Sequence, residues 1–183
     1  MKIAILAVLL VPILLACGDE VVNYSAPVGI NTKLRSTDVG AGGAVLLTKN
    51  INTESGNPYG AFVNAAARAL GRPPSRIAVT YLTLELLPSS TGVDNLNQVF
   101  TGQVATGFDL AGSLYPVGTA VNPAGVGFPM AASFDSAGLD PTAYDDLVGG
   151  GFPVILSGTA TSGFAGAGAT ADLKTTFGFI AYQ

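Results

Sequence analysis

In six segments between residues 77 and 182, apolar side chains recur at every second position, and this alternation restricts the fold more than any other feature of the sequence. Successive side chains of a β-strand point to opposite faces, so the pattern predicts strands that bury one face. An earlier strand is expected over residues 44–51. The other expected strands cover residues 77–87, 100–110, 114–121, 126–134, 152–161 and 172–182.

Two parts of this pattern support more specific predictions. In the segment 77–87 apolar residues fall on both faces, which predicts a central strand covered on both sides for part of its length. One face carries Leu82, Leu84 and Leu86, and the other carries Ile77, Val79 and Tyr81. The segments 152–161 and 172–182 are expected to pair with each other through the glycine-rich connection 162–170, which is interpreted as a mobile loop.

Two helices interrupt the strands. One is expected after Asn57, which can cap it, because Pro58 suits the first helical position and Gly71 can end the helix. A shorter helix is expected from Pro141 to Val148, with Asp140 as its cap. This combination predicts a mainly β domain, an antiparallel β-sandwich of the immunoglobulin-like or jelly-roll type with one or two short connector helices. A small closed barrel is the alternative architecture.

The start of the chain has a different character. Lys2 is followed by thirteen uncharged residues, Ile3–Leu15, which match the apolar region of a secretory signal. A membrane-spanning helix needs roughly 20 residues, so this stretch is too short for one. The run that ends it, Leu14-Leu15-Ala16-Cys17, resembles the lipobox of bacterial lipoprotein precursors. The resemblance implies that residues 1–16 are a signal peptide and that the thiol of Cys17 receives a diacylglyceryl group.

The same resemblance implies a location and a division of the chain. Lipoproteins of Gram-negative bacteria are often retained at the inner membrane when aspartate directly follows the lipidated cysteine. Here Gly18 follows Cys17, so we expect the cell envelope, at the outer membrane, with attachment through the N-terminal lipid. Residues 17–39 are expected to be the lipidated N-terminus and a tether, ending in an uncertain first strand, and residues 40–183 a single β-sandwich domain.

Composition excludes several kinds of chemistry. The chain contains no histidine, and Cys17 is its only cysteine, so a Ser-His-Asp triad and a histidine-based metal site are excluded. The net charge of −4 argues against nucleic acid as a partner, because phosphates require basic patches. We therefore expect no enzymatic activity, no cofactor and no nucleic-acid partner.

Three arginines form the first candidate site. Arg68, Arg72 and Arg76 lie at intervals of four residues and could bind an anion from envelope polysaccharide or from a lipid headgroup. Arg68 and Arg72 also suit the C-terminal dipole of the preceding helix.

The second candidate site is a possible calcium site, because calcium binds several oxygen ligands. It consists of four aspartates, Asp135, Asp140, Asp145 and Asp146. Their spacing does not fit an EF-hand, and a helix cap with an exposed helical face explains them better, so no metal is expected. The polar segment 94–98 is interpreted as a capped turn before the strand at residue 100.

These observations predict a lipid-anchored cell-envelope protein that acts as a non-catalytic binding or structural module, with an envelope polysaccharide or a protein as partner. One alternative is a carbohydrate- or matrix-binding adhesin, and another is an assembly subunit that pairs through an edge strand. A third is a hydrolase with a carboxylate pair, formed by Glu54 with Glu85 or Asp109.

Overall fold

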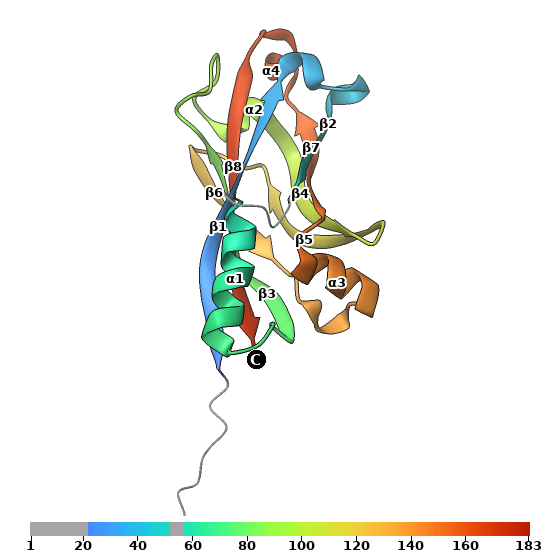
Figure 1. The fold of residues 1–183 in the computed structure, drawn as a ribbon. Helices are drawn as coiled ribbons and strands as arrows, with labels where there is room; N and C mark the ends of the chain where they lie inside the picture. Colours follow the sequence, from blue (N-terminus) through green and yellow to red (C-terminus); the bar gives the residue numbers. More distant parts are fainter. Residues whose placement is uncertain (1–21, 52–56) are drawn as a thin grey trace, which may run out of the picture.

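A computed structural model describes residues 22–51 and 57–183 and shows a mainly β domain with short helices (Figure 1). The described strands are β1 (Asn23–Arg35), β2 (Ala44–Asn50), β3 (Arg76–Leu86), β4 (Phe100–Leu110), β5 (Ser113–Val121), β6 (Gly127–Ala132), β7 (Pro153–Ala160) and β8 (Thr170–Tyr182). The described α-helices are α1 (Pro58–Leu70), α2 (Leu96–Val99), α3 (Pro141–Gly149) and α4 (Ser162–Gly166), and short 3-10 turns lie at Ser36–Asp38, Ala41–Gly43 and Ser136–Gly138.

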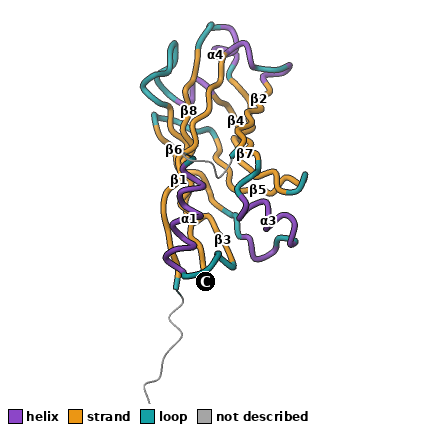
Figure 2. Tube along the Cα trace, viewed as in Figure 1, coloured by secondary structure: helices purple, strands orange, loops and turns teal. Residues whose placement is uncertain are grey.

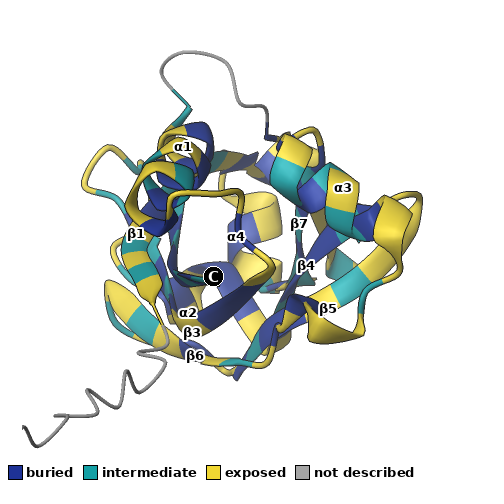
Figure 3. Cartoon of the chain, turned by 60° about the horizontal axis from the view of Figure 1, so that its bottom comes forward, coloured by how far each residue is buried: buried dark blue, intermediate teal, exposed yellow. Residues whose placement is uncertain are grey.

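The described strands form one antiparallel sheet in the order β1-β8-β3-β6-β5-β4-β7-β2. Strand β6 joins its two halves, because its first part pairs with β3, from Gly127 to Met130, and its end pairs with β5, at Ala131 and Ala132. The sheet curves until its end strands β1 and β2 come into contact, so that it nearly closes (Figure 3). The predicted mainly β, antiparallel class is therefore confirmed.

Strand β1 occupies most of the segment that was predicted to be a tether. It pairs with β8 along its whole length, from Asn23 opposite Tyr182 to Arg35 opposite Thr170. Its inward side chains, including Val28, Ile30 and Leu34, are buried. The tether prediction is thus wrong for residues 23–35, because turn-forming residues on the outward face, Pro27, Gly29 and Asn31, concealed a regular alternation.

Strand β3 contains a bulge that corrects a second prediction. Val79 lies opposite Phe179 and Tyr81 lies opposite Gly178, so Thr80 is an extra residue in β3. The insertion turns Ile77 and Val79 to the same buried face as the following leucines and leaves Tyr81 48% exposed on the outside. Both faces of β3 are covered only at its start, where Ala78 is buried as well as Ile77 and Val79, and the predicted assignment of Tyr81 to a covered face is wrong because of the bulge.

The two predicted helices are confirmed. Asn57 caps α1 by accepting a hydrogen bond from the Tyr59 amide, and Gly71 ends it in a left-handed conformation. Asp140 caps α3 by accepting from the Ala143 amide at 2.9 Å. The predicted turn at 94–98 is confirmed as well, because Asn95 caps the short helix α2.

The expected hairpin between residues 152–161 and 172–182 is wrong. Strand β7 pairs with β4 and β2, whereas β8 pairs with β1 and β3, so these consecutive strands lie in different halves of the sheet. The glycine-rich connection contains the helix α4, which Thr161 caps through its hydroxyl, in place of the expected loop alone. Figure 2 shows α2 and α4 at one end of the domain and α1 near the other.

An aromatic cluster fills the space between the halves. Phe108 of β4 lies 4.9 Å from Phe134, 5.2 Å from Phe152 and 5.5 Å from Phe177, measured between ring centroids. Helix α1 extends this cluster, because Tyr59 lies 5.2 Å from Phe179. The Tyr59 hydroxyl donates to the Leu147 carbonyl at 2.8 Å and so connects α1 with α3.

Candidate functional site

The three predicted arginines lie at one end of the domain, around the connection between α1 and β3. All three are exposed, but their environments differ. The Arg76 Nε donates to Asp135 Oδ1 at 2.8 Å, its Nη2 contacts Oδ2, and its guanidinium lies 4.8 Å from the centre of the Tyr182 ring. Arg68 and Arg72 form no ion pair with the described residues. The predicted group of three therefore separates into one paired and two unpaired cations.

The four predicted aspartates do not converge on one point. Asp135 binds Arg76 and accepts from the Ala137 amide at 2.9 Å, and the hydrogen bond from Arg76 is the main reason that its pKa is lowered. Asp140 caps α3, Asp146 accepts from the Ala111 amide at 2.7 Å, and Asp145 is exposed. Within residues 22–51 and 57–183, no group of three or more acidic, histidine or cysteine side chains could hold a metal ion.

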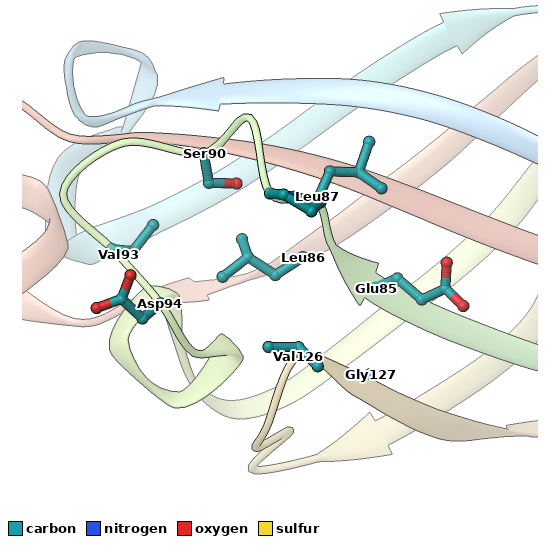
Figure 4. A pocket seen from close by; sticks show the side chains of 9 residues that line it. Glu85, Leu86, Leu87, Ser90, Val93, Asp94, Val126 and Gly127 are labelled. Carbon is teal, nitrogen blue, oxygen red and sulfur yellow. The ribbon is translucent and has the colours of Figure 1, made fainter.

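The candidate site is a pocket of about 600 Å³ between the end of β3, the connection from β3 to α2, and the start of β6. We call it the β3–β6 pocket (Figure 4). Its lining residues are Glu85, Leu86, Leu87, Pro88, Ser90, Val93, Asp94, Val126 and Gly127.

Hydrogen bonds between the two walls fix the shape of this pocket. The Leu86 amide donates to the Val126 carbonyl at 2.8 Å. Asn95 connects the far end, because its Oδ1 accepts from the Gly125 amide at 2.7 Å as well as from the Asn97 amide at 3.2 Å. One asparagine thus caps α2 and holds the turn before β6.

The pocket has an apolar middle and acidic ends. Figure 4 shows Glu85 and Asp94 at opposite ends, with Leu86 and Val126 between them. Val126 is 66% exposed, which is unusual for a valine and makes it an accessible apolar surface of the site. Glu85 Oε2 also lies 3.7 Å from Lys174 Nζ. This arrangement suits a ligand with an apolar group next to a positive charge.

The carboxylate pairs predicted for a hydrolase, Glu54 with Glu85 or Asp109, stay predictions, because each of them includes Glu54. Glu54 lies outside the described residues. Glu85 belongs to β3 and Asp109 to β4, which are in different halves of the sheet. Sequence reasoning identified Glu85 but missed the apolar residues beside it. The available signal was Val126, an apolar residue directly after the turn that ends at Gly125.

A second exposed feature lies on the outer face of β3. The ring of Tyr81 covers the α-carbon of Gly178 on β8, so closely that any β-carbon at position 178 would overlap the ring. Ser25, Pro27 and Thr80 line a small cavity of about 180 Å³ beside this ring. One face of the Tyr81 ring therefore packs on Gly178, and the ring is also open to solvent.

None of the described helices combines the length and the apolar character needed to span a membrane. No protein-family model matches the chain, and no curated protein matches its sequence. Among solved structures, the chain is similar to a protein described as the decameric BFDV capsid protein, with 12% sequence identity and a TM-score of 0.39. That alignment covers 88% of this chain and 99% of the other.

Proposed function

We propose that this protein is a lipid-anchored, non-catalytic binding module of the cell envelope and that the β3–β6 pocket receives its partner. The observation that carries the proposal is the pocket itself, with its apolar middle and acidic ends. The Asp94 carboxylate offers a place where a cation of the partner can bind, whereas Glu85 already lies 3.7 Å from Lys174 Nζ.

The chemistry of the pocket favours a protein segment as the partner. None of its lining residues is aromatic, so it offers no ring on which a sugar could stack. A lysine or arginine side chain of a partner could bind Asp94 while a neighbouring apolar side chain covers Val126. Burial of an exposed valine contributes about 1.5 kcal/mol or more to such a contact.

Photo-crosslinking in cells that make the full-length protein tests this proposal. A photoreactive amino acid replaces Val126 in one variant and Val121 in the control, because these two valines are 66% and 64% exposed and only Val126 lines the pocket. We expect a crosslinked product when the probe is at position 126 and none when it is at position 121. The substitution Asp94→Asn should lower the yield of the product at position 126. Equal products at both positions would refute the assignment of the pocket.

The proposed anchor rests on the lipobox resemblance of residues 14–17 and is tested separately. Globomycin, or the substitution Cys17→Ala, is followed by fractionation of membranes. We expect the untreated protein in the outer-membrane fraction, the globomycin-treated protein as an uncleaved precursor that keeps residues 1–16, and the Cys17→Ala protein without lipid. Recovery of lipid-free, soluble protein from untreated cells would contradict the anchor.

We also propose that the domain is a jelly roll. Its support is the strand order, in which β1-β8-β3-β6 and β2-β7-β4-β5 form two halves and most consecutive strands alternate between them. The alternative, a closed barrel, requires backbone hydrogen bonds between β1 and β2. Amide hydrogen exchange distinguishes the two, because free edges of β1 and β2 exchange quickly in a sandwich and slowly in a closed barrel.

A carbohydrate-binding adhesin is the second candidate, and Tyr81 is the observation that favours it. Exposed aromatic rings held flat on a sheet can stack on sugar rings. Binding of the intact protein to a panel of envelope polysaccharides, compared with Tyr81→Ala and with Leu114→Ala as an equally apolar control, tests this candidate. Leu114 is 62% exposed on β5, away from Tyr81. Loss of binding only in Tyr81→Ala would support the adhesin.

A further inference from the structure

We infer that the end of the domain bearing Arg68 and Arg72 docks on the anionic phospholipid surface that holds the lipidated N-terminus. This inference rests on the proposed anchor at Cys17 and adds to it a surface, an orientation and two residues. The reasons are the distance that the chain can span before β1, the hydrogen bonds at this end, and the charges that it presents.

The first described residue lies close to the proposed anchor along the sequence. Four residues lie between Cys17 and Val22, so five steps along the chain join them, and these span at most about 18 Å. Whatever path residues 18–21 take, the end of the domain that contains Val22 is therefore held within this distance of an acylated Cys17. Salt screens the electrostatic attraction between a charge and the bilayer over a Debye length of about 8 Å at physiological ionic strength. Charges at the end of the domain nearest the anchor therefore interact with the bilayer more strongly than charges farther away.

Hydrogen bonds place the arginines at that same end. The Gln183 amide donates to the Val22 carbonyl at 3.1 Å, and the Ser75 amide donates to the Tyr182 carbonyl at 3.0 Å. The side-chain amide of Gln183 reaches the Leu70 carbonyl at 3.5 Å. The start of β1, the end of β8 and the connection from α1 to β3 thus form one end of the domain, where Figure 1 also shows the C-terminus.

The two arginines at this end are available for contact with a ligand. Arg68 lies in the last turn of α1 and Arg72 follows directly after Gly71, and both are exposed without an ion pair among the described residues. Arg76 is engaged by Asp135 and takes no part. Asp19 and Glu20 add two acids between the anchor and β1. The positive charges of Arg68 and Arg72 would offset the negative charges of those acids. Their guanidinium groups would also bind the phosphates of the membrane surface, because guanidinium binds phosphate well.

The opposite end of the domain lies too far away to share this contact while the domain stands upright. Strand β1 has thirteen residues, which corresponds to roughly 40 Å. Helix α4 lies at that far end, and the connection from β3 to α2 leads toward it. An upright domain therefore holds the connection from β3 to α2, which lines the β3–β6 pocket, toward the end opposite the two arginines.

Headgroup quenching of the full-length lipidated protein tests this inference. A fluorophore is attached to Ala69→Cys at the arginine-bearing end or to Ala165→Cys in α4, both exposed helical alanines. The vesicles contain phosphatidylcholine and phosphatidylglycerol with a nitroxide headgroup lipid. We expect strong quenching at position 69 and weak quenching at 165. Arg68→Ala with Arg72→Ala should shift the equilibrium between docked and undocked states by about fivefold per arginine. Arg35→Ala, at the far end of β1, removes the same charge and should have little effect.

The outcomes separate the docking surface from the anchor. Mass spectrometry of the N-terminal peptide shows whether Cys17 carries lipid, and a free thiol would overturn the proposed anchor together with the docking. If Cys17 is lipidated, equal quenching at positions 69 and 165 would overturn the orientation. Unchanged quenching at 69 in the double arginine variant would overturn the role of the two arginines.

Discussion

The guanidinium of Arg76 and the carboxylate of Asp135 meet across 59 residues of sequence and connect the first residue of β3 to the turn that precedes α3. Asp135 also accepts from the Ala137 amide, so the carboxylate fixes the turn while it holds the arginine. Arg76, predicted as part of an anion site, and Asp135, predicted as part of a calcium site, thus form an ion pair with each other. The pair makes a structural contact between two elements that are adjacent only in the folded domain.

Acid should weaken this contact. Arg76 lowers the pKa of Asp135 below its unfolded value of about 3.9, so the pair stabilises the folded state above that pH and loses its effect as the pH falls through the folded pKa. We expect Arg76→Ala to reduce the thermal midpoint at pH 6 and to differ little from the wild type at pH 2. Arg72→Ala serves as the control, since Arg72 has no such partner among the described residues. A constant difference across this pH range would contradict the prediction.

Tyr59→Phe should destabilise the domain by about 1–2 kcal/mol, because it leaves the buried Leu147 carbonyl without its donor. Urea denaturation measures this loss. Burial, with a smaller contribution from Tyr144, raises the pKa of Tyr59 well above its usual value. The unfolded chain therefore releases this proton first, and stability falls as the pH rises above about 10. That alkaline loss should be smaller in Tyr59→Phe, and an equal loss in both proteins would refute it.

Gly178→Ala should cost about 1–3 kcal/mol, because the new methyl group overlaps the Tyr81 ring. In a Tyr81→Ala background the ring is gone and the same substitution should cost much less. A double-mutant cycle followed by urea denaturation checks both statements. If Gly178→Ala lowers the free energy of unfolding equally in both backgrounds, the Tyr81 ring is not the reason that position 178 requires glycine.

Phe108→Ala should be among the most damaging substitutions in the domain, at about 3–5 kcal/mol. Its ring is fully buried and lies within 5.5 Å, between centroids, of the rings of Phe134, Phe152 and Phe177. Phe128→Ala is a suitable comparison, because Phe128 is only partly buried at the edge of the core. Thermal unfolding should show a clearly larger drop for Phe108→Ala.

The sequence predicted elements whose signals are local. Asn57, Pro58 and Gly71 determine where α1 begins and ends through contacts within the helix itself, and Asp140 does the same for α3. The alternation in residues 100–110 predicted the buried face of β4 for the same reason. Such features need no knowledge of distant residues.

Features that depend on distant residues were missed. The bulge at Thr80 is visible only against the register of β8, and β1 is a strand because β8 is there to pair with it. The β3–β6 pocket requires Asn95 to bind Gly125, thirty residues later, and the predicted arginine and aspartate groups separated because Arg76 and Asp135 bind each other. No pattern within one segment of the sequence reports these pairings.

The pairing of β1 with β8 also sets an order of events during synthesis. Strand β1 is the first described strand to be made, and the strand with which it pairs along its whole length is the last. Until that last strand is available, the apolar side chains of β1 have no sheet to join, and such long-range pairings form slowly. The domain therefore stays incomplete while its C-terminal strand is still on the ribosome.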